Sequence, residues 1–341
     1  MSRAQSFVVL IIGIALAVTL AAYAPAAPTS TPATARPAAT AVPPTATIAA
    51  QPTKAAAPAS ATYPLTLKDD LGRELKIAQQ PKRIVSLSPS NTEILFAIGA
   101  GPEVVGVTKY CNYPPEAAQG REIVGGFSAK SLSVEKIIAL KPDIVFAAGG
   151  IQKSVIEALD AAKVPVFALE PTDFAGVNTG ILAAGSITGH QKQAEQVVAD
   201  MKARAEKVAA VVAGIPQAQR VRVFYEVWDE PLTTAEPGTF IGQVIQTAGG
   251  DNIYADVKEQ YPVVSTETVV ERNPDVILGP SSHSEGMTGD KISARAGWKG
   301  IKAVQNGRVT IIDGDVISRS GPRLVEGLEA VARALYPDRF K

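Results

Sequence analysis

Two glutamates occupy matching places in a repeated stretch of the sequence. Glu135 lies in SVEKIIALKPDIV (133–145), and Glu267 lies in STETVVERNPDVI (265–277). Each copy is typical of a short helix that begins at a serine and carries a carboxylate in its first turn, with Pro-Asp and a buried strand after it. One interpretation is that each carboxylate only complements the positive end of its helix, worth about 0.3–1 kcal/mol. The other is a pair of exposed acidic knobs, one in each half of the chain, that bind basic residues of a partner.

Aromatic side chains gather in loops that follow predicted strands. They are Tyr110, Tyr113, Phe127, Trp228 and Tyr261. Aromatic residues at such places are more exposed than core aromatics and suit a flat, conjugated ligand. Packing at the edge of a lobe is the alternative explanation for each of them. Arg319 follows a strand and precedes the last predicted helix, where its guanidinium can bind a carboxylate, amide or phosphate of a ligand.

The sequence carries no recognisable catalytic pattern. It has no GxSxG motif, no GxGxxG after a strand and no phosphate-binding loop. Cys111 is the single cysteine and only two histidines occur, which excludes a disulfide, a four-cysteine site and a three-histidine cage. Cys111 itself is either a metal ligand or, as is usual for a lone cysteine, a small buried hydrophobe. We therefore predict a protein that is not an enzyme and has no metal centre or cofactor of its own.

Charge and composition describe a globular protein without nucleic-acid partners. The chain has 341 residues with 33 basic and 33 acidic side chains, so its formal net charge is zero. A balanced charge offers no electrostatic footprint for nucleic acid and no basic run for anionic lipid. A hydrophobic content of 46% and this length are sufficient for two lobes with sizeable cores.

The N-terminus indicates export. Arg3 precedes an uncharged apolar run from residue 7 to residue 22, as in a secretory signal. Residues 1–24 are thus expected to be a signal peptide or, if uncleaved, an N-terminal membrane anchor. Residues 25–62 are almost entirely Ala, Pro and Thr and are expected to form a disordered tether. The folded part is therefore expected outside the cytoplasm, in the periplasm or at the outer face of the cell membrane.

Predicted strands and helices alternate from residue 63 onward, which is typical of parallel sheets covered on both faces. A hairpin is expected around residues 70–72, and a capping box at Ser90–Glu93 is expected to open a helix that Gly99 closes. Gln191–Ala213 has no Pro or Gly and is expected to form one helix of about 34 Å. This helix (191–214) would join an N-terminal lobe (63–190) to a C-terminal lobe (215–341), with a ligand cleft between the lobes.

The chain from Lys82 to Tyr336 resembles class III solute-binding proteins of ABC importers, the family that carries iron–siderophores, haem and cobalamin. The stretches RIVSLSPSNTEILFAIGAG (83–101), VVGVTKYCNYPP (104–115), LSVEKIIALKPD (132–143) and QVIQTAGGDNIY (243–254) look closest to its cobalamin-binding branch. The resemblance implies an α/β fold of two Rossmann-like lobes joined by one rigid helix. It also implies a monomer whose partners are the permease and ATPase of an importer.

The resemblance further implies roles for individual residues. Tyr110, Phe127 and Tyr261 match aromatic residues that pack on a corrin ring, and Leu232 stands where that branch has a phenylalanine. Arg319 matches a cleft arginine, with Asp315 nearby. Glu135 and Glu267 match the glutamates that dock into arginine pockets of the membrane subunits.

We therefore expect a corrinoid between the lobes and only small closure when it binds. Haem or a ferric siderophore is the alternative ligand, with a tyrosine such as Tyr110 or Tyr113 as an iron ligand and Cys111 as the other choice. A ligand-sensing extracellular domain is the alternative from another class of protein.

Overall fold

The described part of the chain begins with a small antiparallel hairpin. The computed structural model describes residues 62–281 and 287–340, so the expected signal or anchor and all but the last residue of the expected tether lie outside the described residues. Strands β1 (Leu65–Lys68) and β2 (Glu74–Ile77) pair around a turn in which Gly72 has a φ of +80°. The Asp69 carboxylate accepts hydrogen bonds from the Leu71 and Arg73 backbone N–H groups, at 3.1 and 2.8 Å. The hairpin predicted here is confirmed.

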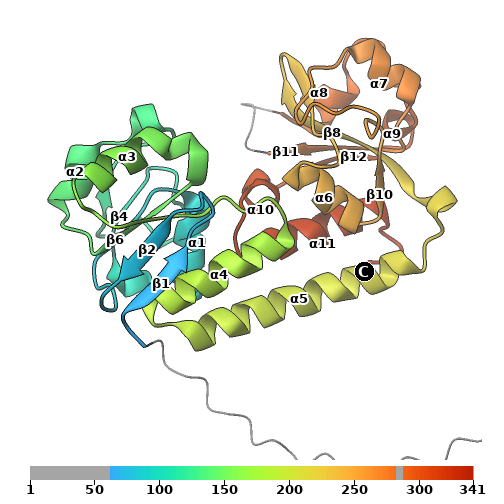
Figure 1. Cartoon of the computed structure of the whole chain (residues 1–341). Coiled ribbons are helices and arrows are strands. Elements are labelled where there is room, and N and C mark those ends of the chain that lie inside the picture. The colour runs from blue at the N-terminus through green and yellow to red at the C-terminus, as the bar shows by residue number, and fades with distance from the viewer. Residues whose placement is uncertain (1–61, 282–286, 341) are drawn as a thin grey trace, which may run out of the picture. The chain divides into compact units, whose positions relative to one another are not determined.

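The N-terminal lobe is built on a parallel sheet with the strand order β5-β4-β3-β6-β7. Every residue of β3, β6 and β7 is buried, which explains why these strands read as short continuous apolar runs. Figure 1 shows α2 and α3 on one side of this sheet and α1 on the side nearer the second lobe. The strands are β3 (Ile84–Ser86), β4 (Val104–Val107), β5 (Glu122–Ile123), β6 (Ile144–Ala147) and β7 (Val166–Ala168), and the helices are α1 (Pro89–Ala97), α2 (Val134–Ala139) and α3 (Lys153–Ala161).

The C-terminal lobe repeats this plan with a parallel sheet in the order β10-β8-β11-β12. Strand β9, which the sequence pattern did not predict, pairs antiparallel with the end of β8. Two parallel sheets in separate lobes confirm the predicted α/β fold class. The strands are β8 (Val221–Asp229), β9 (Leu232–Thr234), β10 (Gly250–Asn252), β11 (Val276–Pro280) and β12 (Val309–Ile312), and the helices are α6 (Phe240–Thr247), α7 (Thr266–Arg272), α8 (Gly289–Ser293), α9 (Lys302–Gln305), α10 (Gly314–Ser318) and α11 (Leu324–Leu335).

One long helix connects the lobes, as predicted. Helix α4 (Phe174–Thr188) ends at Gly189, whose φ of +75° turns the chain back into α5 (Gln191–Ala213). A Cβ added to Gly185 would lie 2.4 Å from the Ala194 Cβ, so glycine lets α4 and α5 cross closely. Helix α5 runs beneath both lobes in Figure 1. The boundaries proposed for the lobes, 63–190 and 215–341, stay a prediction.

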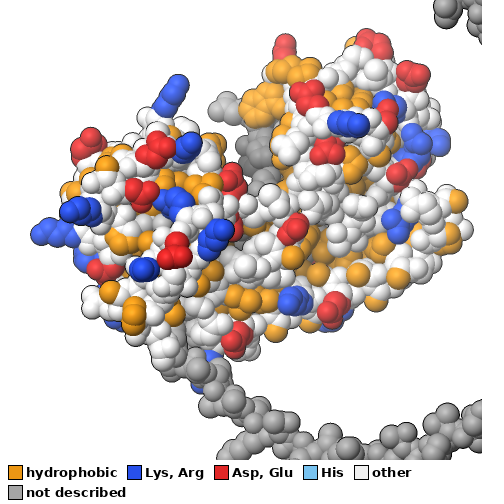
Figure 2. Space-filling view, viewed as in Figure 1, with side chains coloured by type: hydrophobic (Ala, Val, Ile, Leu, Met, Phe, Trp, Pro, Cys, Tyr) orange, Lys and Arg blue, Asp and Glu red, His pale blue; other side chains and the backbone are white. Residues whose placement is uncertain are grey.

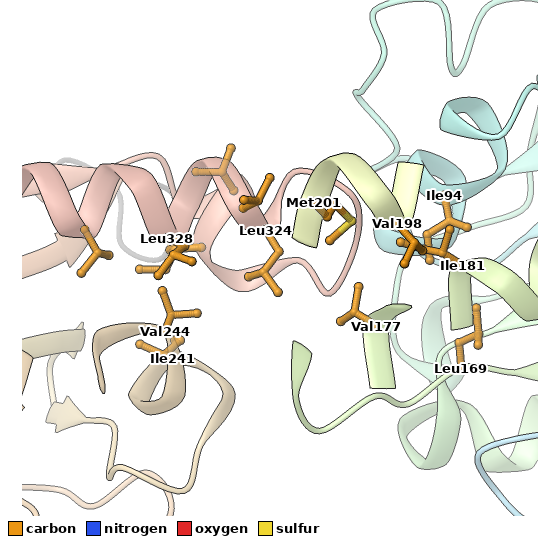
Figure 3. Close-up of a cluster of buried hydrophobic side chains, with 14 of the residues drawn as sticks. Ile94, Leu169, Val177, Ile181, Val198, Met201, Ile241, Val244, Leu324 and Leu328 are labelled. Atoms are coloured by element: carbon orange, nitrogen blue, oxygen red, sulfur yellow. The ribbon is translucent and has the colours of Figure 1, made fainter. Parts of the chain in front are cut away.

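A single apolar cluster follows this helix from one lobe into the other. In Figure 3, Ile94, Val177 and Val198 pack at the end near the N-terminal lobe, and Val244 and Leu328 pack at the other end. All are at most 5% exposed. Closely packed interiors resist displacement, so the cluster restrains how the lobes move about α5.

The beginning of α1 differs from the predicted capping box. The helix cap is Ser88, whose hydroxyl accepts the backbone N–H of Asn91 at 3.1 Å, and Ser90 is already inside the helix. Glu93 does not turn back to the cap; its carboxylate binds arginines of the second lobe. The predicted box failed because Ser90 and Glu93 have the right spacing, but Ser88 before Pro89 starts the helix two residues earlier. Gly99 follows the helix with a φ of +88°, as expected.

The two Ser-Glu repeats form the helices that were predicted. Ser133 caps α2 and Ser265 caps α7, and each serine hydroxyl accepts a backbone N–H three residues on, at 3.2 Å. Glu135 and Glu267 lie in the first turns of these helices. Among residues 62–281 and 287–340, no helix has both the length and the apolar character needed to cross a bilayer.

Candidate functional site

The predicted ligand residues of the N-terminal lobe lie in loops after the sheet strands. Tyr110 follows β4 and Phe127 follows β5, and both side chains are exposed. Gly125 (φ +135°) and Gly126 let the Phe127 loop pass close to Ser131, because a Cβ on Gly126 would lie 2.5 Å from the Ser131 Oγ, and the same Cβ would be in ordinary contact, 3.7 Å, with the Tyr110 ring. The two aromatic side chains thus belong to one patch of the lobe surface.

A buried glutamine that the sequence did not indicate holds this patch in place. The Gln152 amide donates to the Phe127 and Leu87 carbonyl oxygens, both at 2.8 Å. Its own carbonyl oxygen accepts the Ala148 N–H at 2.8 Å. Satisfied buried amides of this kind fix a loop geometry, so Gln152 ties the Phe127 loop to the end of the central strands.

In the C-terminal lobe, the exposed side chains of Trp228 and Val263 lie on one cross-strand face. Trp228 on β8 is opposite Thr233 on β9, and Thr233 is bridged to Val263. Tyr261 lies at a bend two residues before Val263 and is 44% exposed. Figure 2 shows apolar side chains gathered on this lobe beside the hollow that separates it from the other lobe.

Contacts of Arg319 and Ser318 place one aromatic residue of each lobe, Tyr110 and Tyr261, near the same segment. The Arg319 guanidinium lies 3.5 Å from the Tyr110 carbonyl oxygen, while the preceding Ser318 lines a cavity of about 290 Å³ together with Tyr261, Val227, Phe240 and Ile241. Aromatic residues of both lobes therefore flank the segment that contains Arg319. An apolar, two-sided site of this kind suits a flat ligand.

Leu232 is placed differently from the aromatic residues. It is 8% exposed and packs in the interior of the C-terminal lobe with Phe224 and Tyr254. Its predicted contact with the ligand stays a prediction.

Arg319 and Asp315 meet each other and the opposite lobe. The Arg319 guanidinium contacts Asp315 at 2.9 Å, and its other nitrogen contacts Glu93 and Asn112 of the N-terminal lobe, each at 2.7 Å. Protein oxygens thus surround the guanidinium that was expected to face a ligand.

The docking candidates lie on the surface. The Ser133 hydroxyl donates to Glu135 at 3.1 Å. The Glu267 carboxylate accepts hydrogen bonds from the Glu267 backbone N–H and from the Ser265 and Thr266 hydroxyls, and these hydrogen bonds lower the pKa of Glu267.

Ile151 and Val263 are the most exposed of the apolar residues that the sequence interpretation missed in the described part of the chain. Ile151 is 52% exposed and follows β6 in the short 3-10 helix Gly149–Gln152, and Val263 is 64% exposed. Their neighbours Gly149–Gly150 and Tyr261–Pro262 signal loops, but aliphatic residues give no sign of exposure in a sequence. Val263 extends the apolar face that carries Trp228.

The remaining reactive groups are structural. The Cys111 thiol is buried against the Thr92 and Thr108 hydroxyls, at 3.1 and 3.2 Å. Burial raises the pKa of Tyr225, which is 1% exposed on β8. In the described ranges, no three His, Cys, Asp or Glu side chains cluster to hold a metal ion.

Two lobes with parallel sheets, one connecting helix and an apolar region between them define a solute-binding protein of the class III type. The chain belongs to the periplasmic binding protein family, whose model matches residues 84–316. It is therefore the solute-binding protein of an ABC importer, not an enzyme, and its partners are a permease and an ATPase.

Named relatives differ in their ligands. An uncharacterized ABC transporter substrate-binding lipoprotein of Bacillus subtilis is 34% identical over 82% of this chain and 88% of its own length. A cobalamin-binding protein of Halobacterium salinarum is 31% identical over 81% of this chain and 75% of its own. The structure of a possible iron-binding periplasmic solute-binding protein from Staphylococcus epidermidis is 31% identical, with a TM-score of 0.65 over 76% of this chain and 100% of that chain.

Proposed function

We propose that this protein captures a corrinoid such as cobalamin outside the cytoplasm and delivers it to the importer. The observation that carries the proposal is the pair of exposed apolar faces, Tyr110 and Phe127 on one lobe and Trp228 and Tyr261 on the other, on either side of the Arg319 segment. Aromatic and aliphatic side chains suit the broad apolar faces of a macrocycle. The halobacterial relative named for cobalamin supports the same ligand.

The two apolar faces also suit haem, the other macrocycle that the family carries. The exposed Tyr110 hydroxyl is a potential ligand for ferric iron, and the staphylococcal relative is described as an iron binder. Haem or a ferric siderophore is therefore the second candidate. Tyr110 would ligate the iron of haem or a siderophore through its hydroxyl, but would only pack its ring against a corrin. Tyr110→Phe should therefore weaken binding of an iron ligand and leave cobalamin binding nearly unchanged.

The test is a titration of the purified protein with cyanocobalamin, haemin and a ferric siderophore. Trp228 is exposed beside the proposed site and Trp298 is fully buried in the C-terminal lobe, so ligand should quench mainly Trp228. We expect saturable 1:1 binding of cyanocobalamin below micromolar concentration, about −8 kcal/mol or better. A haem Soret shift or siderophore quenching without cobalamin binding would keep the importer role and replace the ligand.

Variants locate the site. Phe127→Ala and Tyr261→Ala should each weaken cyanocobalamin binding about tenfold, because each removes an aromatic face worth about 1.4 kcal/mol or more. Ile138→Ala is the matched control, since Ile138 is an exposed apolar residue on the docking helix α2. If Phe127→Ala, Tyr261→Ala and Ile138→Ala all bind cyanocobalamin with the affinity of the wild-type protein, the ligand binds elsewhere.

A further inference from the structure

Glu93 is a buried carboxylate of the N-terminal lobe whose charged partners both come from the other lobe. Its side chain is 1% exposed. One oxygen accepts from Arg319 at 2.7 Å, and the other accepts from the Nε of Arg323 at 3.0 Å. The arginines are 226 and 230 positions away in the chain and lie between α10 and α11.

The loop after β4 completes a network across the lobes. Asn112 donates to Asp315 at 2.9 Å and accepts from Arg319 at 2.7 Å. The Arg323 guanidinium lies 4.0 Å from the centroid of the Tyr113 ring. Two carboxylates and two guanidinium groups balance to zero charge, which is the condition under which such groups tolerate burial.

The network lies beside the connecting helix. Glu93 and Arg323 line a cavity of about 630 Å³ together with Val197, Met201 and Arg204 of α5. A Cβ added to Gly321 would be 3.4 Å from the Ser90 carbonyl oxygen, so the backbones of the two lobes also approach closely there. Rotation of one lobe about α5 would separate these groups, and a small displacement this near the helix becomes a larger one at the outer rims of the lobes.

We propose that Glu93 is a positioning residue that clamps the two lobes beside α5, and that Arg319 and Arg323 serve this clamp. The matching pair Glu226–Arg295 shows the contrast. Glu226 is also buried and holds Arg295 through two contacts of 2.8 Å, but both residues belong to the C-terminal lobe. Loss of Glu226 disturbs one lobe. Loss of Glu93 leaves two largely buried guanidinium groups with Asp315 as the one carboxylate of the network, a net charge of +1 at the lobe contact.

The clamp keeps the two aromatic faces at a defined separation. Tyr110 and Asn112 belong to one loop, and Ser318, which borders Tyr261, precedes Arg319. Asn112 is thus two positions from Tyr110, and Arg319 is one position from Ser318, so the clamp residues adjoin both walls of the cleft in the chain. Only this consequence for ligand affinity rests on the proposed function; the clamp itself does not.

The first test measures the distance between the lobes without any ligand. Spin labels at Ala161→Cys on α3 and Glu271→Cys on α7 report it, because both positions are exposed and Cys111 is buried. In the ligand-free protein, Glu93→Gln should broaden the distance distribution and shift it to longer distances. Glu226→Gln, the same chemical change inside one lobe, should leave the distribution unchanged.

A milder variant guards against misfolding. Asn112 is exposed, and Asn112→Ala removes two hydrogen bonds across the lobes without leaving a buried charge. It should broaden the distribution in the same direction, by less than Glu93→Gln. Distributions identical to wild type in both folded variants, or an equal change in Glu226→Gln, would overturn the clamp.

The second test measures cyanocobalamin affinity in the same variants. Glu93→Gln should weaken binding about tenfold, Glu93→Asp should recover part of the loss because it keeps the charge, and Glu226→Gln should bind as wild type. A broadened distribution with unchanged affinity would retain the clamp and refute its effect on the cleft. If wild type does not bind cyanocobalamin, the distance measurement still decides the clamp, and the ligand proposal alone fails.

Discussion

Arg204 and Glu329 link the connecting helix to the last helix through a paired contact. The Arg204 guanidinium donates two hydrogen bonds of 2.9 Å to the Glu329 carboxylate, and both side chains are about a quarter exposed. Hydrogen bonding to Arg204 lowers the pKa of Glu329, and the charge attraction of the arginine acts in the same direction. Bidentate, partly buried pairs of this type are stronger than surface ion pairs.

Glu329→Gln should lower the free energy of unfolding by about 1–2 kcal/mol near pH 7. Since the folded pKa is depressed, this contribution is present above the unfolded pKa of about 4.3 and is lost as the pH falls through the folded value. Urea unfolding of both proteins between pH 3 and pH 8 measures the difference. It should be constant above pH 5 and shrink below pH 4; a difference that is equal at all pH values would contradict the ionic origin.

Among the elements, the α4–α5 pair depends on close contact of two helices. Gly185 and Ala194 are both buried where α4 and α5 cross, and Gly185 is not in the left-handed region. Space, and not backbone conformation, is therefore the reason for glycine at this position.

Gly185→Ala should destabilise the protein by about 1–3 kcal/mol, because the added methyl group overpacks the crossing. Gly300→Ala is the control, since its Cβ would meet open space and the change should stay within about 0.5 kcal/mol. Urea unfolding measures both. A Gly185→Ala protein as stable as wild type would mean that the helices separate freely and that the contact does not restrain the lobes.

At the scale of the whole molecule, α2 and α7 present the same motif once in each lobe. Each helix begins at a serine cap and carries a first-turn glutamate at the surface. The apolar cluster along α5 and the network at Glu93 hold the lobes that carry these helices. We propose that Glu135 and Glu267 contact the permease, and a restrained molecule offers them at a nearly constant separation.

Glu135→Lys with Glu267→Lys should abolish corrinoid uptake in cells that depend on this importer, because two attractive contacts become repulsive. Affinity of the purified protein for the ligand should be unchanged. Glu157→Lys with Glu206→Lys, which alters net charge equally at exposed positions of α3 and α5, is the control and should transport normally. Loss of ligand affinity in the first variant would refute the docking role.

Much of the fold could be predicted from the sequence because its signals are local. Buried runs identified most strands of the two sheets, serine caps identified α2 and α7, and the absence of Gly and Pro identified α5. The exposure of the loop aromatics also followed from their places after strand ends. Local failures had local causes: Ser88 competed with Ser90 as the helix cap, and β9 is too short to show a pattern.

The partners of side chains were decided by the tertiary structure. Glu93 could be read as a capping residue from its spacing to Ser90, yet its partners lie more than 200 positions away and no local pattern points to them. The same holds for Gln152, which fixes the Phe127 loop, and for Ile151 and Val263, whose exposure no aliphatic pattern reveals. Short-range forces determine elements and their caps, whereas a buried charge takes whichever opposite charge the packing of the two lobes brings to it.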